Sequence, residues 1–187
     1  VKIKNVTVKN FNGDGISFQQ CKNTLIESSR CINNTGNGLH PGSGSVGSVI
    51  RKTVCSGNGG DGIFYCLRVS YALCENCIIE NNGNDGISIG HRDTDSIIRG
   101  NRIAGNGRHG IYFRQDSLNM TGNRTLIESN QIEGNCCKNG RGEIFFDSLT
   151  SDVHILNNSF GNGASGKESN PSIYLNSSQQ GLIVYNN

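Results

Sequence analysis

The stretch NNGNDGISI, residues 81–89, contains the pattern that decides the fold. It joins a turn rich in Asn, Gly and Asp to a run in which apolar and polar residues alternate. The same Gly-apolar pair begins at Gly15, Gly38, Gly62, Gly86 and Gly110, at a nearly constant step. A fixed period of this length predicts a repeat architecture in which each unit stacks on the one before it.

Two further rows of residues follow the same period. An apolar row contains Ile26, Ile50, Cys74 and Ile98 and continues at wider spacing through Ile127, Ile155 and Ile183. A polar row contains Asn34, Asn58, Asn82 and Asn106. If equivalent residues stack, the apolar row fills the interior, and the Asn row forms a ladder of side-chain amides that satisfies buried backbone groups.

Each unit holds three short alternating runs separated by turn residues. In one unit these are Ile87–Ile89, Ser96–Arg99 and Arg102–Ala104, and such runs are typical of strands. A leucine-rich repeat has a similar period, but it needs a dense Leu pattern, and Ile outnumbers Leu here. We therefore predict an all-β fold, a right-handed single-stranded parallel β-helix (solenoid) of about seven coils, with roughly 24 residues per coil and longer coils toward the C-terminus.

The composition excludes several classes of protein. Gly and Asn each occur 26 times in 187 residues while Ala occurs 3 times, which is incompatible with a helical bundle. A net charge of +2 without runs of Lys or Arg argues against a nucleic-acid partner. No apolar stretch exceeds five residues, so we expect no membrane insertion. The length predicts one domain, residues 1–187.

The ends of the predicted solenoid are the next feature. No amphipathic helix is visible to cover the first or the last coil, and open coils expose strand edges. The chain begins at Val1 without a signal-peptide pattern. We therefore expect part of a longer parent chain, located outside the cell, at its surface or in the periplasm, with end-to-end or lateral self-association as a further possibility.

One face of the solenoid gathers the titratable and aromatic residues. In the strand after each Gly-apolar pair, alternation turns one row outward: Ser17, His40, Phe64, Ser88, Tyr112, Phe145 and Tyr174. A second outward row follows two residues later: Gln19, Gly42, Cys66, Gly90, Arg114, Asp147 and Asn176. Arg68, His91, Arg92, Asp93 and Asp116 come just beyond that strand. We expect these side chains on one face within a few coils.

Such a set matches the needs of chemistry on uronic acids. Removing the proton next to a carboxylate requires a cation that neutralises the carboxylate, a base, and an acid. The candidate catalytic residues are His91 or His40 as the base, Arg92 or Arg114 as the cation and Tyr112 as the acid. The candidate substrate-binding residues are Arg68, Asp93, Asp116 and the aromatic Phe64 and Phe145. The alternative is a solvated polar face on which His91, Arg92 and Asp93 form only a turn with a local ion pair.

Two insertions lie beside the same face. The step from Ile98 to Ile127 is longer than the regular period, and its excess falls in residues 115–123. A second excess falls in residues 136–141. Long loops along one sheet of a solenoid build the walls of a groove, although surface insertions are also tolerated without any function.

Metal binding and cysteine chemistry have weaker signals. Asp61 and Asp85 precede the repeat Gly on neighbouring coils, where their oxygens would suit Ca²⁺, but Asp-Gly is also an ordinary turn pair. Cys31 and Cys55 lie one period apart and would stack as small core residues or form a bridge. We expect no cofactor other than this possible Ca²⁺.

The repeat Asn-Asn-Gly-x-Asp-Gly-Ile at 81–87 resembles those of the pectate-lyase-like superfamily, along nearly the whole chain. Within it, the chain is distantly similar to the catalytic modules of alginate C5-epimerases. That family has Tyr-Gly-Phe-Asp-Pro-His and a later Arg-His-Gly-Phe, where this chain has NGLHPG at 37–42 and RHGI at 108–111. His40 stands in place of the family's Asp and Gly42 in place of its His. The resemblance implies a parallel β-helix and chemistry on uronan polysaccharides.

The leading hypothesis is therefore an enzyme that acts on an acidic, uronate-containing polysaccharide by lyase or C5-epimerase chemistry. The alternative is a non-catalytic carbohydrate-binding or structural β-helix segment of a larger surface protein. A glycosidase would need two carboxylates across a groove, for which Asp93, Asp116 and Asp147 are the candidates.

Overall fold

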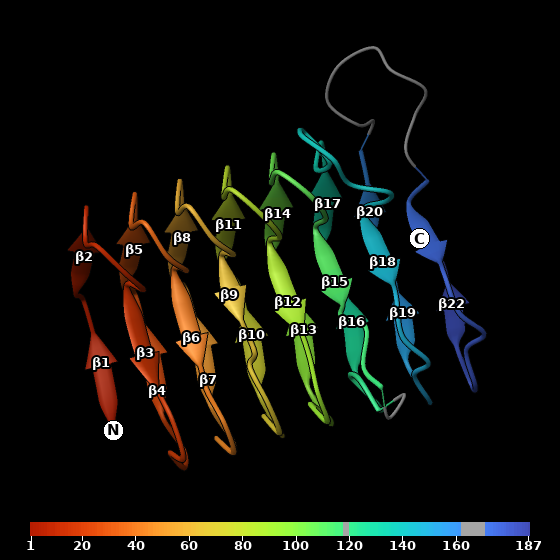
Figure 1. Ribbon diagram of the computed structural model, residues 1–187, viewed down its shortest axis with the longest axis horizontal. Coiled ribbons are helices and arrows are strands. Elements are labelled where there is room, and N and C mark those ends of the chain that lie inside the picture. The colour runs from red at the N-terminus through yellow and green to blue at the C-terminus, as the bar shows by residue number, and fades with distance from the viewer. Residues whose placement is uncertain (118–119, 162–170) are drawn as a thin grey trace.

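The computed structural model describes residues 1–117, 120–161 and 171–187. These residues form a right-handed parallel β-solenoid of about seven turns, with equivalent positions about 24 residues apart and no helix. The strands lie side by side along the long axis, and the two termini lie at opposite ends (Figure 1). The described residues contain no helical segment with the length and hydropathy needed to cross a membrane.

Three parallel sheets run along the solenoid, and each coil contributes one strand to each sheet. Sheet A contains β1 (Lys2–Lys4), β4 (Leu25–Glu27), β7 (Val49–Arg51), β10 (Leu73–Glu75), β13 (Ile97–Arg99), β16 (Leu126–Glu128), β19 (His154–Leu156) and β22 (Ile183–Tyr185). Sheet B contains β2 (Thr7–Lys9), β5 (Arg30–Ile32), β8 (Val54–Ser56), β11 (Ile78–Glu80), β14 (Arg102–Ala104), β17 (Gln131–Glu133) and β20 (Ser159–Phe160). Sheet C contains β3 (Ile16–Phe18), β6 (Leu39–Pro41), β9 (Ile63–Phe64), β12 (Ile87–Ile89), β15 (Ile111–Phe113), β18 (Ile144–Phe146) and β21 (Ile173–Leu175).

The register confirms the predicted apolar row, except for its last member. Cys74 pairs with Ile50 on one side and Ile98 on the other, and all three are fully buried. In the last coil, however, Ile155 pairs with Val184, while Ile183 pairs with His154 on the outward row. The prediction that Ile183 continues the row is wrong. Both Ile183 and Val184 are about half exposed. Since neither is buried, the sequence pattern cannot show which of the two faces inward.

The interior is a stack of similar rungs. Cys31 and Cys55 are buried neighbours in sheet B, and both are free thiols. Phe113 and Phe146 stack at 4.3 Å between ring centroids in the later coils. The repeat Gly allows this close stacking, because a Cβ on Gly86 would lie 2.6 Å from the carbonyl oxygen of Gly110 in the next coil.

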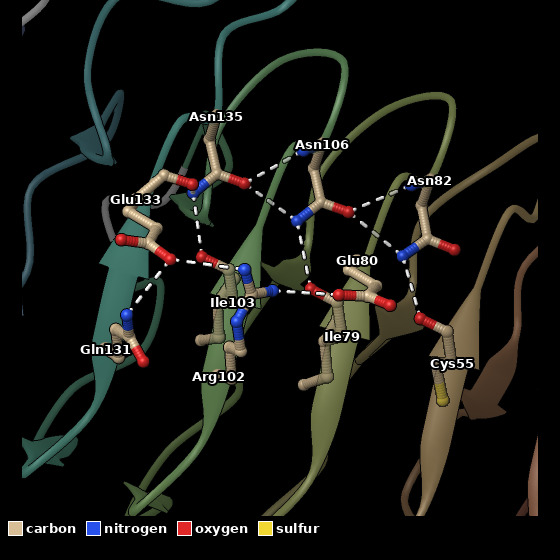
Figure 2. Close-up of polar contacts among 10 residues, drawn as sticks. All are labelled: Cys55, Ile79, Glu80, Asn82, Arg102, Ile103, Asn106, Gln131, Glu133 and Asn135. Atoms are coloured by element: carbon tan, nitrogen blue, oxygen red, sulfur yellow. Dashed lines mark hydrogen bonds and ion pairs between the residues drawn. The ribbon is translucent and has the colours of Figure 1, made fainter. Parts of the chain in front are cut away.

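The predicted Asn ladder is present and is longer than expected (Figure 2). Asn82 donates from its backbone N and from Nδ2 to Oδ1 of Asn106, at 3.0 Å each, and Asn106 donates in the same way to Asn135. The ladder ends at Glu143, whose carboxylate accepts both donors of Asn135. Burial raises the pKa of Glu143, which occupies the position of the repeat Gly in its coil.

Exposed charges on neighbouring coils alternate in sign over much of the surface. On sheet A, Arg51 pairs with Glu27 at 2.6 Å and Arg99 pairs with Glu75 at 2.9 Å. On sheet B, Arg102 lies between two acidic residues, Glu80 at 2.8 Å and Glu133 at 3.2 Å (Figure 2). Because stacked side chains are separated by only about 4.8 Å, alternation converts repulsion between coils into attraction.

Apolar side chains are exposed at both terminal coils. Phe11 is 55% exposed in the first coil and Tyr185 is 69% exposed in the last. Tyr185 belongs to the last strand of sheet A, and Phe11 lies in the turn after β2, where another coil or another molecule would contact them. End-to-end or lateral self-association stays a prediction.

Candidate functional site

The outer face of sheet C has an aromatic surface over its later coils. The register places Ser88, Tyr112, Phe145 and Tyr174 in one outward row, as expected from the sequence. The Tyr112 and Phe145 rings are parallel to within 4° at 5.5 Å, and Phe145 is 5.4 Å from Tyr174. Ser88 and Phe145 are buried, so Phe145 is not an open stacking surface as the sequence predicted. Tyr112 and Tyr174 are partly exposed and offer ring area with one hydroxyl each.

His109 lies beside this row and is oriented by a buried carboxylate. Asp85 is fully buried, and its Oδ1 lies 2.9 Å from Nδ1 of His109 and accepts the His109 backbone N–H at 3.1 Å. Oδ2 of Asp85 accepts a hydrogen bond from Nη2 of Arg108. A carboxylate at Nδ1 favours the tautomer with the proton on that nitrogen, which leaves a lone pair on Nε2. That Nε2 is buried and has no hydrogen-bond partner in the described structure.

Tyr112 is held by a second carboxylate. Its hydroxyl donates to Oδ2 of Asp147 at 2.8 Å, and Nδ2 of Asn176 donates to Oδ1 of the same residue. Burial, together with this hydrogen bond, raises the pKa of Tyr112 to about 12. The phenol is therefore protonated at neutral pH and is a proton donor.

These groups surround one pocket of about 290 Å³, here named the Tyr112 pocket. It is lined by Arg108, His109, Tyr112, Asn139, Arg141, Phe145, Asp147 and Asn176. Asn139 and Arg141 come from the second insertion, which confirms that this insertion forms a wall beside sheet C. Arg141 lies 6.0 Å from the centre of the Tyr174 ring, so the pocket contains two guanidinium groups, a His, a Tyr and a carboxylate.

A second pocket, of about 360 Å³, lies at the turns that follow sheet C and is here named the Arg68 pocket. It is lined by Leu67, Arg68, His91, Arg92, Asp116 and Ser117. Nδ1 of His91 lies 3.0 Å from Oδ1 of the buried Asp116. Asp116 and Ser117 belong to the first predicted insertion, of which residues 118 and 119 lie outside the described residues.

His40 and Phe64 form a third group on the earlier coils. Nδ1 of His40 lies 2.7 Å from Oδ2 of Asp14, and the two aromatic rings meet edge to face at 5.0 Å. The Nε2 atom of His40 is buried without a hydrogen-bond partner among the described residues. His40, His91 and His109 therefore share one arrangement, a carboxylate at Nδ1.

Arg114 connects the third group to the Tyr112 row. Its guanidinium donates to Oγ of Ser88 at 2.7 Å and to two backbone carbonyls, Tyr65 at 2.6 Å and Cys66 at 2.9 Å. It also lies 4.2 Å above the Phe64 ring. Burial lowers the pKa of this guanidinium. A Cβ on Gly90 would collide with Nη2, so the missing side chain of Gly90 provides the space for Arg114.

The carboxylate of Asp93 is hydrogen-bonded by the backbone. It is buried, and it accepts N–H groups from Val69 at 2.8 Å and Gly90 at 2.6 Å. Burial raises its pKa to about 6. Asp93 thus holds the turn that positions His91 and Arg92.

The structure divides the predicted site residues among these groups instead of placing them around one point. Tyr112 and Phe145 share the first pocket; Arg68, His91, Arg92 and Asp116 share the second; His40 and Phe64 lie together, with Arg114 beside them. The Arg108–His109 pair with Asp85 was not among the predicted catalytic residues. The sequence feature that could have identified this pair is the spacing from Asp85 to His109, which equals one regular period and puts the two residues on neighbouring coils.

Asp61 and Asp85 do stack on neighbouring coils, but their oxygens have protein partners. Oδ1 of Asp61 accepts the backbone N–H of Asp85 at 3.0 Å, and Asp85 is bound by Arg108 and His109. Among the described residues, no cluster of three or more His, Cys, Asp and Glu side chains is placed to hold a metal. Ca²⁺ at this position stays a prediction.

Replacing Asp61 by Asn is expected to stabilise the fold above pH 6. Burial and the neighbouring Asp85 raise the pKa of Asp61 from 3.8 to about 6, so ionisation of this carboxyl costs stability as the pH rises through that range. Asn37 holds the equivalent position one coil earlier, and its Oδ1 accepts the backbone N–H of Asp61 at 2.8 Å. We expect Asp61→Asn to raise the free energy of unfolding by about 2 kcal/mol at pH 8 and to leave it nearly unchanged at pH 4.

Urea unfolding of the two proteins at pH 4 and pH 8 measures this difference. A gain of equal size at both pH values would contradict the assignment to ionisation of Asp61.

The sequence of residues 1–187 matches the family described as right handed beta helix region. No curated protein matches the chain in sequence.

Solved structures match the fold at low sequence identity. The A-module of mannuronan C-5 epimerase AlgE4 from Azotobacter vinelandii has a TM-score of 0.79 at 17% identity, covering 99% of this chain and 53% of that one. A double mutant of the periplasmic alginate epimerase AlgG has a TM-score of 0.75 at 12% identity, covering 98% of this chain and 49% of that one. An alginate lyase from Paenibacillus sp. has a TM-score of 0.57 at 11% identity, covering 97% and 98%. The chain thus spans about half the length of the two epimerase structures, and at these identities the likeness concerns the fold.

Proposed function

Because the chain belongs to the right-handed β-helix family, we propose that it acts on an acidic, uronate-containing polysaccharide at the outer face of sheet C, by lyase or C5-epimerase chemistry. One observation carries the proposal: His109 held by Asp85, Tyr112 held by Asp147, and two arginines all line a single pocket. A solvated face with no function has no need of two side chains, each held by a carboxylate, in the lining of one pocket.

The residues of the Tyr112 pocket supply each part that the chemistry needs. Arg141, together with the N–H groups of Arg108 that do not bind Asp85, neutralises the carboxylate of the sugar, which makes the proton on the adjacent carbon easier to remove. Asp85 holds the proton of the imidazole at Nδ1 and stabilises the cation that forms, so His109 is the base. Its Nε2 is buried, and it takes the proton once the side chains that cover it move aside as the sugar binds. The Tyr112 hydroxyl, kept protonated by its raised pKa, supplies the second proton.

The position of that second proton decides the product. If Tyr112 protonates the glycosidic oxygen on the neighbouring carbon, the bond to that oxygen breaks and a carbon–carbon double bond forms, which is the lyase reaction. If it protonates the same carbon from the opposite face, the configuration inverts, which is the epimerase reaction. In either reaction His109 gains one proton and Tyr112 loses one, and transfer of a proton from His109 back to Tyr112 restores both. No electrons are transferred, so no redox partner is needed.

The comparisons support the substrate class. The matching structures include proteins titled as mannuronan or alginate epimerases and an alginate lyase, and these share this fold along nearly the whole chain. One neighbour is titled periplasmic, which supports our proposal that the protein acts in the periplasm or outside the cell.

Incubation with alginate, pectate and glycosaminoglycans tests the proposal. We expect ultraviolet absorbance from an unsaturated product with a lyase, or inversion at C5 in the NMR spectrum with an epimerase. Tyr112→Phe keeps the ring that stacks on Phe145 but removes the acid, so the rate is expected to fall by about 100-fold or more.

The matched control is Tyr71→Phe, which alters an exposed Tyr at the turn before β10 and should retain full activity. Activity that survives in Tyr112→Phe would contradict the role given to this hydroxyl, and silence across the whole panel would contradict the enzymatic proposal.

A second candidate function is carbohydrate binding without reaction. The observation that favours it is the pair of partly exposed rings, Tyr112 and Tyr174, which pack on the buried Phe145 and would hold sugar rings without any proton transfer. Binding of the polymer by the parent and by Tyr112→Phe, with no product from either, would be the result expected of this function.

A further inference from the structure

The turn after sheet C breaks the alternation of charge seen elsewhere on the surface. Arg68 and Arg92 occupy the same turn position on consecutive coils, since Leu67 forms a parallel bridge with His91 and the backbone N–H of Arg68 donates to the His91 carbonyl at 2.8 Å. Both arginines have a left-handed backbone conformation, with φ of 55° and 56°. Two guanidinium groups therefore project from neighbouring rungs about 4.8 Å apart.

The charges of these two guanidinium groups are not balanced by a neighbouring acid in the described parts of the chain. No carboxylate among the described residues lies within ion-pair distance of Arg68 or Arg92, whereas Arg51, Arg99 and Arg124 each have one. The nearby acids have other partners, because Asp116 binds His91 and Asp93 binds backbone N–H groups. Like charges on neighbouring strands destabilise a sheet unless a counter-charge lies between them.

The arginines also border an open cavity. The Arg68 pocket has a volume of about 360 Å³. Leu67 forms part of its lining, and the side chain of His91, also in the lining, is half exposed. Two planar forks with five N–H donors each, beside an imidazole, fit the oxygens of a carboxylate better than they fit a neutral sugar. The lining holds two arginines against one carboxylate, Asp116, which faces His91. The cavity therefore keeps a net positive charge, and it has the space for an anionic group.

We propose that the Arg68 pocket binds the carboxylate of a second uronate of the polymer, as an anchoring site separate from the Tyr112 pocket. This inference rests on the proposed function for the class of polymer but not for the reaction. Arg68 and Arg92 bind the carboxylate, and His91, oriented by Asp116, donates or accepts a hydrogen bond at the sugar. These residues act in binding, and the proton transfers take place at the Tyr112 pocket.

The separation of the two pockets determines the length of ligand that uses both. Tyr112 and Asp116 lie in the same coil, four residues apart, which corresponds to up to about 13 Å of extended chain. A hexamer is long enough to span that distance and to reach from one pocket to the other. We expect a uronate dimer to occupy the Tyr112 pocket and a hexamer to use both.

Calorimetric titration with hexamers and dimers of mannuronate and of galacturonate, at fixed ionic strength, tests the anchor. The variants Arg68→Gln/Arg92→Gln and Arg51→Gln/Arg99→Gln each lose two positive charges, but the second pair lies on sheet A, away from both pockets. Both are made in a Tyr112→Phe background so that no product forms during the titration. We expect the first variant to weaken hexamer binding by about 10-fold or more and to leave dimer binding unchanged, and the control to change neither.

Each result decides the inference independently of the reaction. An equal loss in both variants would show that net charge alone attracts the polymer and would overturn the anchor, as would a parent protein that binds neither hexamer. Selective loss in Arg68→Gln/Arg92→Gln, in a protein whose Tyr112-containing form yields no product, would support the anchor and overturn the reaction. If the parent protein forms product and the affinity for the hexamer is unchanged in Arg68→Gln/Arg92→Gln, the reaction would be supported and the anchor overturned.

Discussion

An Asn82→Ala variant is expected to lose about 4 kcal/mol or more of its free energy of unfolding. The side chain of Asn82 accepts two hydrogen bonds from Asn58, at 3.1 and 2.9 Å, and donates to the Cys55 carbonyl at 3.1 Å and to Asn106 at 3.0 Å. Alanine removes all four interactions and leaves their partners buried without replacements; Figure 2 shows the contacts of Asn82 with Cys55 and Asn106. Each such loss costs about 1 to 3 kcal/mol, and the deleted amide leaves a cavity that adds to the cost.

Asn84→Ala is the matched control, because Asn84 lies in the same turn, two residues away, with its side chain exposed. It should change the free energy of unfolding by no more than about 0.5 kcal/mol. Urea unfolding followed by circular dichroism measures both variants. Similar losses in the two would mean that any Asn in this turn is needed for its backbone conformation, and the ladder would not be the source of stability.

The fold was predictable because the same sequence pattern recurs in each coil of a solenoid. The pairs at Gly62, Gly86 and Gly110 fix the coil length, and once that length is known, sequence spacing gives spatial neighbours directly. This is why the sheets, the outward row of sheet C and the Asn ladder all agree with the sequence. The error at Ile183 occurs in the last coil, where Val184 is equally exposed and neither residue is required to face inward.

The site was harder to predict, since its grouping depends on side-chain direction and on the insertions. His91 and Tyr112 lie on neighbouring coils, yet one points into the turn after sheet C and the other lies on the sheet. Arg141 belongs to an insertion that breaks the period, so its place beside Tyr174 has no signal in the spacing. The partners of Asp85 could not be predicted for another reason: a carboxylate in a turn has the same sequence whether it binds a metal, a backbone N–H or a histidine.

Replacing His109 by Gln is expected to lower kcat by about 100-fold to 10,000-fold with little change in KM. Gln keeps a donor for Asp85 and similar bulk beside Phe145, but it has no lone pair basic enough to take a proton from carbon. Because the carboxylate of the sugar is bound by Arg108 and Arg141, which remain, the affinity for substrate should be retained. Steady-state rates on the active polymer, read by absorbance or NMR, measure the effect.

Two further histidines make this prediction specific. His154→Gln alters a residue on the outer face of sheet A and should have no effect on the rate, which excludes a general sensitivity to His replacement. His91→Gln removes a residue of the Arg68 pocket and is expected to weaken the use of long substrates while leaving kcat on saturating polymer unchanged. Since His91 and His109 are each oriented by a carboxylate, only their neighbours distinguish their roles: His109 shares its pocket with the Tyr112 hydroxyl, and His91 shares its pocket with two arginines. A loss of kcat in His91→Gln with normal rates in His109→Gln would move the reaction to the Arg68 pocket and leave the Tyr112 row as the surface that binds the polymer.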